Sequence, residues 1–128
     1  MAAKVLLFPT DGGYVAFPRY YLPEEAVTDG RNASYRGWHA EGRIITTPGN
    51  VLDFERVEAD ILEDMKNFDV QEMAIDPYEA RQLVQRLMAQ NVPVVEIMQT
   101  VAQLSEPTKE LDALTRSSRF RYNCPILL

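Results

Sequence analysis

Short apolar runs alternate with amphipathic stretches along most of this chain, and that alternation limits the folds it can form. After a β-rich opening, the order is strand, helix, strand, helix, strand and helix. A helix between two strands implies that the strands run parallel, whereas strands joined by a short turn run antiparallel. The sequence therefore predicts an α/β domain with one mixed sheet and helices on its faces. The expected strands are residues 4–8, 14–21, 43–46, 73–75 and 94–97.

The local patterns behind this prediction differ in kind. Residues 9–13 (Pro-Thr-Asp-Gly-Gly) form a turn signal between the first two strands and predict a hairpin. Asp53 precedes apolar residues spaced for one helix face, which are Phe54, Val57, Ile61, Leu62 and Met65. A second helix is expected over residues 78–90, with Leu83, Val84, Leu87 and Met88 facing inward. A last helix is expected to begin at Ser105, with Leu111 and Leu114 buried.

Composition narrows the class of protein. A chain of 128 residues suits one domain, and a hydrophobic fraction of 46% is ordinary for a folded protein. No apolar run approaches the ~20 residues that a membrane span needs, so no membrane partner is expected. Cys124 is the only cysteine, which excludes an internal disulfide and fits a reducing compartment.

Charge is distributed unevenly. The net charge of −6 argues against a free-standing nucleic-acid binder, because such proteins are usually basic. Ten acidic residues lie between positions 53 and 79, and we interpret them mainly as the solvated face of a helix. Four basic residues lie between positions 109 and 121 and could contact phosphates, although four charges make a small electrostatic footprint.

Asp76 has two interpretations. It follows the apolar run Met73–Ile75 where a helix is expected to begin, and the carboxyl end of a strand is where α/β proteins commonly place catalytic groups. Asp76, Pro77 and Glu79 also match a helix-capping box with proline at the first helical position. The two roles are compatible, because a carboxylate at a helix N-terminus stays ionised, as a metal ligand must.

Other chemical signatures are few. The phosphate-binding patterns G-x-x-x-x-G-K-[ST] and G-x-G-x-x-G are missing, so no residue is assigned to cofactor binding. His39 is the only histidine and is expected at the surface, which argues against zinc sites and histidine-dependent nucleophiles. Among the carboxylates, Asp53 is interpreted as a cap and Glu96 as a solvent-facing strand residue, which leaves Asp76 as the candidate for chemistry.

Several short sequence motifs, taken in their order along the chain, resemble those of one family. They are Thr-Pro-Gly-Asn-Val-Leu-Asp-Phe at residues 47–54, Ala-Ile-Asp-Pro-Tyr at 74–78 and Leu-Ser-Glu-Pro-Thr-Lys-Glu-Leu at 104–111, with Tyr-Leu-Pro-Glu-Glu at 21–25 in support. This series resembles the C-terminal nuclease domain of the large terminase subunit of tailed phages. The resemblance runs from about residue 4 to residue 127.

The resemblance implies a ribonuclease H-like fold and a metal-dependent endonuclease that cuts concatemeric viral DNA during packaging. Asp76 matches the acid on the family's second motif strand, and is therefore the expected catalytic residue and ligand of Mg²⁺ or Mn²⁺. Such centres use hard oxygen ligands around two ions about 4 Å apart.

The chain departs from the family pattern in three ways. The family's first acid lies on a strand before the opening hairpin, and its last acid lies on a helix beyond the phrase Cys-Pro-Ile-Leu at residues 124–127. Tyr122 occupies the place where relatives commonly carry a histidine. We therefore expect residues 1–128 to be a partial nuclease domain without the first strand, the last helix or the packaging ATPase domain, and to be inactive in isolation.

Two alternatives compete with this hypothesis. The chain could be a non-catalytic interaction module of the packaging machinery, or an unrelated small α/β binding protein in which Asp76 is only a cap. By resemblance, the full-length partners are double-stranded DNA, the terminase ATPase domain, the small terminase subunit and the portal, in the cytoplasm of a bacterial host. A partner chain or second copy is also expected to cover the exposed sheet edge.

Overall fold

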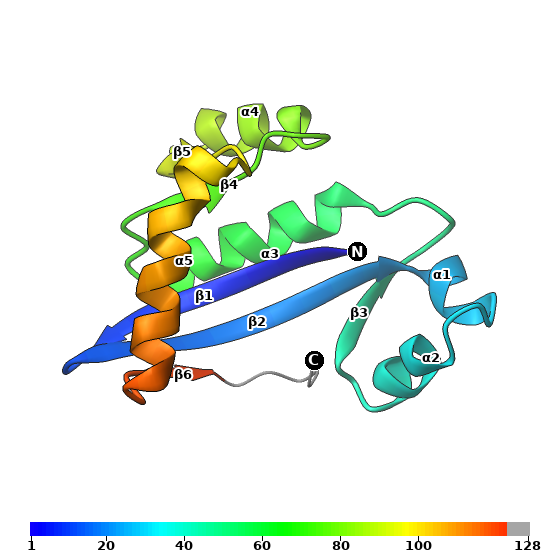
Figure 1. Cartoon of the computed structure of the whole chain (residues 1–128). Coiled ribbons are helices and arrows are strands. Elements are labelled where there is room, and N and C mark those ends of the chain that lie inside the picture. Colours follow the sequence, from blue (N-terminus) through cyan, green and yellow to red (C-terminus); the bar gives the residue numbers. More distant parts are fainter. Residues whose placement is uncertain (123–128) are drawn as a thin grey trace. The chain divides into compact units, whose positions relative to one another are not determined.

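The computed structural model describes residues 1–122 of the chain (Figure 1). The described chain divides into two compact units, one formed by residues 1–53 and 111–122, and one formed by residues 54–110. Among the described residues, no helix is both long and apolar enough to cross a membrane.

A long hairpin dominates the first unit. Strands β1 (Ala2–Thr10) and β2 (Gly13–Pro23) pair antiparallel along the whole of β1, from Ala2 opposite Tyr21 to Thr10 opposite Gly13. Gly12 supplies the positive φ of 82° that a tight turn between such strands requires. The predicted hairpin is therefore confirmed, with strands longer than expected.

The second edge of β2 carries two shorter parallel strands. Strand β3 (Ile44–Thr47) pairs with the end of β2, and strand β6 (Phe120–Tyr122) pairs with its beginning. The sheet is mixed, as predicted, because β1 runs antiparallel to β2 while β3 and β6 run parallel to it. Strand β6 was not predicted from the sequence.

Two short helices cover the end of β2 and β3. Helix α1 (Glu24–Thr28) was not expected. Helix α2 (Ala33–Ala40) ends two residues before Gly42, whose φ of 74° is typical of a glycine that follows a helix. Asn32 caps α2 by accepting a hydrogen bond from the Ser34 N–H at 3.1 Å. The core of this region consists of Leu22, Val27 and Ile44, with Tyr20, Ala26, Tyr35 and Trp38 packed against it.

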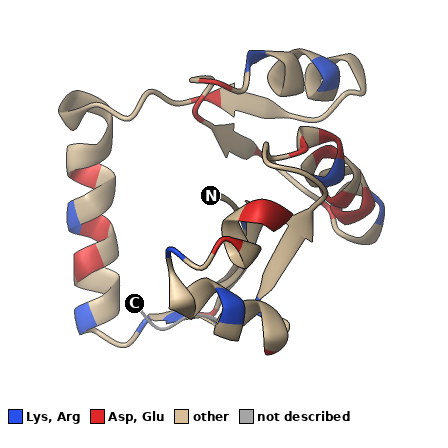
Figure 2. Cartoon of the chain, turned by 90° about the vertical axis from the view of Figure 1, so that its right-hand side faces the viewer, with Lys and Arg blue, Asp and Glu red and all other residues tan. Residues whose placement is uncertain are grey.

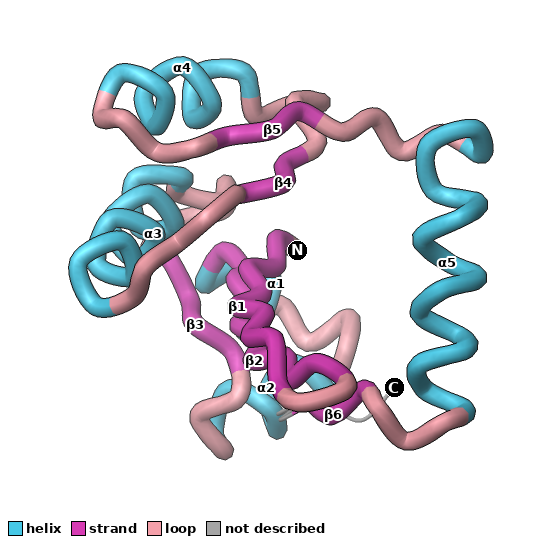
Figure 3. The backbone as a smooth tube through the Cα atoms, turned by 90° about the vertical axis from the view of Figure 1, so that its left-hand side faces the viewer, coloured by secondary structure: helices cyan, strands magenta, loops and turns pink. Residues whose placement is uncertain are grey.

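The second unit alternates helices and strands. Helix α3 (Phe54–Asn67) is followed by β4 (Met73–Ile75), α4 (Arg81–Ala89) and β5 (Val94–Glu96). Strands β4 and β5 are parallel and lie side by side (Figure 3). The predicted inward faces are largely confirmed, because the buried residues here include Val57, Ile61, Leu83, Val84 and Leu87. Phe54 and Met88 are exceptions, 38% and 46% exposed.

The prediction of one sheet is wrong in detail. In the described part of the chain, β4 and β5 form a two-stranded sheet of their own, separate from the four-stranded sheet of β1, β2, β3 and β6. Strand composition shows that a segment is extended, but it does not name the strand that pairs with it. Within residues 1–122, β1 and β4 each have a strand partner along one edge only.

Helix α5 (Val101–Arg116) also differs from its prediction. It begins before Ser105, because the Thr100 hydroxyl accepts a hydrogen bond from the Gln103 N–H at 3.3 Å and so caps the first turn. Pro107 consequently lies inside the helix. No residue of α5 is buried, and Leu111 is 46% exposed, so the expected burial of this helix face is wrong.

Candidate functional site

Asp76 lies at the carboxyl end of β4, directly after Ile75, and is half-buried. Its Oδ1 accepts a hydrogen bond from the Tyr78 N–H at 2.9 Å. The chain then turns, with the Ala80 N–H donating to the Pro77 carbonyl oxygen at 3.1 Å. Asp76 is therefore oriented by the loop that follows the strand.

The capping-box interpretation of Asp76 is wrong. Helix α4 begins at Arg81, and Ala80 occupies the N-cap position without a side-chain cap hydrogen bond. Glu79 has a φ of 59°, in the left-handed region, so the helix cannot extend back to residue 78. Glu79 is therefore no capping partner either. Asp76 stabilises the turn after β4 and does not cap α4.

Glu96 lies at the end of the neighbouring strand but does not share a face with Asp76. The β4–β5 register pairs Ile75 with Glu96, so these two side chains lie on one face of the pair. Asp76, one residue further, starts on the opposite face. Glu96 is exposed, as predicted.

The described residues do not by themselves fit a divalent metal ion. Across residues 1–122, no group of three or more His, Cys, Asp or Glu side chains comes together as an ion would require. Mg²⁺ and Mn²⁺ prefer several convergent oxygen ligands, and Asp76 supplies one carboxylate.

The remaining candidates lie close to where the sequence placed them. Asp53 immediately precedes α3, as expected of a cap, and its N–H donates to the Oγ1 of the buried Thr47 at 3.1 Å. His39 is exposed on α2, with its Nε2 3.5 Å from the Thr46 Oγ1, which confirms a surface position. Cys124 lies outside the described residues, and Tyr122 is 59% exposed on β6.

One member of the acidic stretch departs from its prediction. Most of these carboxylates are at least partly exposed, many of them on α3 (Figure 2), but Glu58 is only 6% exposed. Its Oε2 lies 3.0 Å from the Arg86 Nε, and its Oε1 accepts a hydrogen bond from the Gln90 Nε2 at 2.9 Å. Glu58 therefore joins α3 to α4 rather than forming part of a solvated face.

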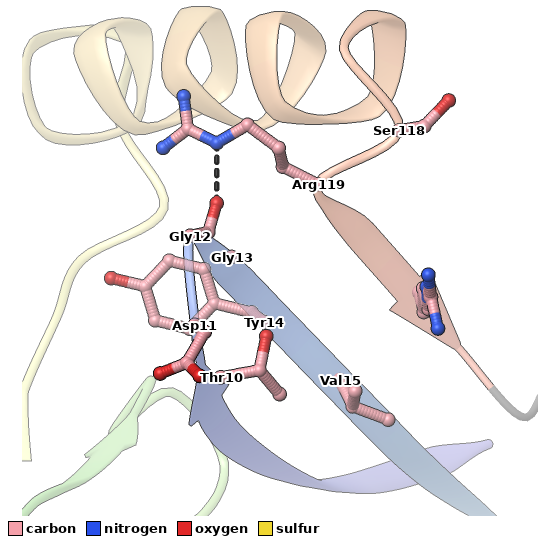
Figure 4. Close-up of a pocket in the computed structure, with 9 residues that line it drawn as sticks. Thr10, Asp11, Gly12, Gly13, Tyr14, Val15, Ser118 and Arg119 are labelled. Carbon is pink, nitrogen blue, oxygen red and sulfur yellow. Dashed lines mark hydrogen bonds between the residues drawn. The ribbon is translucent and has the colours of Figure 1, made fainter.

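A second feature, missed by the sequence analysis, is a recess beside the hairpin turn (Figure 4). Its volume is ≈ 380 Å³, and it is lined by residues of the turn, of β2 and of β6. Arg119 and Arg121 are its two basic residues. The run of basic residues is visible in the sequence, but its position against the hairpin depends on the unexpected β6 pairing.

Comparison with known proteins identifies the family of the chain. The profile of a family described as "Terminase large subunit, endonuclease domain" matches residues 1–128, the whole chain. The chain belongs to this family. The match favours neither the unrelated binding protein nor the non-catalytic module.

Individual relatives agree with the assignment. The chain is 31% identical over 123 residues to the terminase large subunit of Enterobacteria phage HK97, covering 91% of this chain and 24% of the relative. It is 29% identical over 117 residues to Protein YmfN of Escherichia coli (strain K12), covering 86% of this chain and 26% of the relative. The chain therefore spans about a quarter of the length of these relatives.

Comparison with solved structures also identifies a large terminase as similar to this chain. The crystal structure of the HK97 bacteriophage large terminase matches with a TM-score of 0.81 and 29% identity, covering 96% of this chain and 27% of that chain. The fold is accordingly the ribonuclease H-like α/β fold of the terminase nuclease, as expected from the sequence.

Proposed function

We propose that this chain contributes to the endonuclease of a phage DNA-packaging terminase, which cuts concatemeric viral DNA. The proposal is supported by the family match over all 128 residues and by the likeness to the HK97 large terminase. In the longer protein, the partners would be double-stranded DNA, the packaging ATPase domain, the small terminase subunit and the portal. The reaction would take place in the cytoplasm of the bacterial host.

The observation that carries the catalytic part of the proposal is the position of Asp76. It lies at the carboxyl end of a parallel strand, where α/β folds gather functional groups, and it does not cap α4. Its Oδ1 is oriented by the Tyr78 N–H, while its Oδ2 accepts no hydrogen bond from the described residues. Asp76 is therefore pre-oriented with one carboxylate oxygen available to a metal ion.

The same geometry limits what the isolated chain would do. Because no cluster of ligands forms within residues 1–122, the other carboxylates of a metal centre would have to come from other segments. We expect the purified 128-residue chain to bind Mg²⁺ or Mn²⁺ weakly and to nick DNA negligibly. Robust Mg²⁺-dependent cleavage by this chain would contradict that expectation.

The test of Asp76 is a substitution in a longer terminase that contains this chain. Asp76→Asn should keep the hydrogen bond from Tyr78, because an amide oxygen also accepts, but should remove the charge. Cleavage of duplex DNA should fall by on the order of 10²-fold or more, since even outer-shell partners of metals contribute 10–100-fold.

Glu96→Gln is the matched control, because Glu96 ends the neighbouring strand on the opposite face. It should leave cleavage near the unmodified rate. If the Asp76→Asn variant cleaves DNA at the unmodified rate, the role of Asp76 is only to stabilise the turn after β4.

The edge of β1 that has no strand partner among residues 1–122 supports a further part of the proposal. An unpaired strand edge presents backbone groups that readily accept another strand, and β1 has a described partner only on its β2 side. A second copy, or another segment of the longer protein, would pair with this edge. Light scattering on the purified chain tests the first possibility, and a strictly monomeric species at high concentration would exclude it.

A further inference from the structure

The basic residues near the end of the described chain fall into two classes. On α5, the Lys109 Nζ lies 3.2 Å from the Glu106 carboxylate, and the Arg116 Nε lies 3.0 Å from that of Asp112. Arg119 directly precedes β6 and Arg121 lies within it. Neither arginine has an ion pair with any residue in the described part of the chain. Two positive charges therefore remain available there, in a chain whose net charge is −6.

The position of these arginines is fixed by the backbone. The Tyr14 N–H donates to the Arg119 carbonyl oxygen at 2.8 Å, and β6 then pairs in register with Tyr14, Val15 and Ala16. Gly13 permits this approach, because a Cβ built there would lie 1.8 Å from the Arg119 carbonyl oxygen. A residue with any side chain at position 13 would push β6 away from the hairpin.

Strand alternation then places both arginines on one side of the chain. Arg119 and Arg121 are two residues apart, which corresponds to roughly 6.6 Å along an extended chain. Phe120 and Tyr122 lie on the other side, with ring centroids 6.2 Å apart. The basic and aromatic side chains of this segment are therefore segregated.

One of the two guanidinium groups is held in place. The Arg119 Nε donates a hydrogen bond to the Gly12 carbonyl oxygen, and the side chain lies over the hairpin turn (Figure 4). Its two terminal nitrogens are not engaged by other described residues. Both arginines line the recess of ≈ 380 Å³, together with Ser118, Tyr14 and one acid, Asp11. The charges of these side chains leave the recess net positive.

We propose that this recess binds the phosphate backbone of duplex DNA. The inference deepens the proposed nuclease function and rests on it, because DNA is the substrate that the function implies. Guanidinium groups present paired N–H donors that match phosphate oxygens, and a group already held by the turn loses less freedom on binding. Because the chain has a net charge of −6, it repels a polyanion overall, and a local positive recess directs the approach of DNA.

The experiment measures binding of a fluorescently labelled duplex to the 128-residue chain by anisotropy at low salt, with EDTA present. Arg121→Gln is the main variant, because Arg121 makes no described ion pair whose loss would disturb the fold. It should weaken binding about three- to tenfold and lower the slope of log affinity against log salt by about 1. Arg119→Gln should act in the same direction, and circular dichroism checks that the hairpin remains folded.

The matched control is Arg31→Gln. Arg31 is 91% exposed, far from the recess in sequence, and lies 3.6 Å from Asp29. This substitution removes the same charge, so it should change affinity less than twofold if binding is local. Asp11→Asn is the reciprocal variant. It removes the one acid among the described residues that line the recess and should strengthen binding.

Four outcomes would overturn the proposal. They are no duplex binding at low salt, equal losses for Arg121→Gln and Arg31→Gln, weaker binding by Asp11→Asn, and competition by millimolar inorganic phosphate that abolishes duplex binding. The last would indicate a site for free phosphate. Because EDTA removes metal, these results do not depend on Asp76. Loss of the arginine effects with cleavage still sensitive to Asp76→Asn would reject the recess alone, and the reverse pattern would reject the nuclease role alone.

Discussion

The two sheets of this chain are held together in different ways. In the larger sheet, β1 and β2 have nine and eleven residues, and all nine residues of β1 pair with β2. In the smaller sheet, β4 and β5 have three residues each, and a ladder that short is not stable without support. That support includes Leu87 of α4, which is fully buried and whose carbonyl oxygen accepts from the Val92 N–H at 3.1 Å.

Because of this difference, the side chains of the two candidate sites are held in position in different ways. The basic recess is built on backbone pairing of long strands, with glycine allowing close approach. Asp76 is built on a three-residue strand whose position depends on side-chain packing of helices. Substitutions in the helix core should therefore disturb Asp76 more than the recess.

The largest expected effect is that of Leu87→Ala. Truncating a fully buried leucine should lower the free energy of unfolding by about 2–5 kcal/mol. Native-state hydrogen exchange should show that the amides of β4 and β5 lose protection first. Leu22→Ala is the matched control in the larger sheet, with a similar cost but with early exposure of β2 and β3 amides. If both variants expose the same amides together, the contrast between the sheets fails.

A smaller effect is expected from Glu58→Ala. It removes the hydrogen bonds from Arg86 and Gln90 that join α4 to α3, and such bonds to a charged group contribute about 1.5–3 kcal/mol. Glu55→Ala is the control, because Glu55 is 75% exposed and lies 3.9 Å from the Arg86 Nη1. It should cost less than about 0.5 kcal/mol. If urea unfolding shows that Glu58→Ala and Glu55→Ala lower the free energy of unfolding equally, the buried ion pair contributes no more than a surface charge.

The smallest effect is expected at the edge of the larger sheet. Gly13→Ala should cost about 1–2 kcal/mol, because the chain can avoid the clash with Arg119 by releasing the few hydrogen bonds of β6. Gly37→Ala is the same substitution inside α2, where the added Cβ would meet no described atom within 4 Å beyond its chain neighbours and its own helix backbone, and should instead stabilise by about 0.5–1 kcal/mol. Thermal unfolding followed by circular dichroism distinguishes the two signs, and a neutral Gly13→Ala would show that β6 is not held by this approach.

Features set by neighbouring residues could be predicted from the sequence. The hairpin follows from the turn residues 9–13, and the buried face of α3 follows from the spacing of Val57 and Ile61. Both are decided within a few residues, by turn chemistry in one case and by helical periodicity in the other. The position of Asp76 after β4 was predicted for the same reason.

Competing local signals and the pairing of distant segments could not be predicted in this way. Pro77 and Glu79 matched a capping box, but the left-handed Glu79 moves the helix start to Arg81. Pro107 marked a helix start that capping by Thr100 placed earlier. The separation of β4 and β5 from the larger sheet, and the pairing of β6, depend on which strands meet, and no local pattern encodes that.

The pairing of β6 with the hairpin has a consequence for folding order. Gly12 and Arg119 are 107 residues apart, and closing a loop of that length costs about 4 kcal/mol of chain entropy before any interaction compensates it. At ribosomal rates of about 5–20 residues per second, the hairpin exists for roughly 5 to 20 seconds before Arg119 is synthesised. The turn around Gly12 therefore forms first, and Arg119 and Arg121, which line the recess beside it, are synthesised near the end of the chain. The recess is thus a late product of synthesis, and it should be among the first parts of the structure to open when the chain begins to unfold.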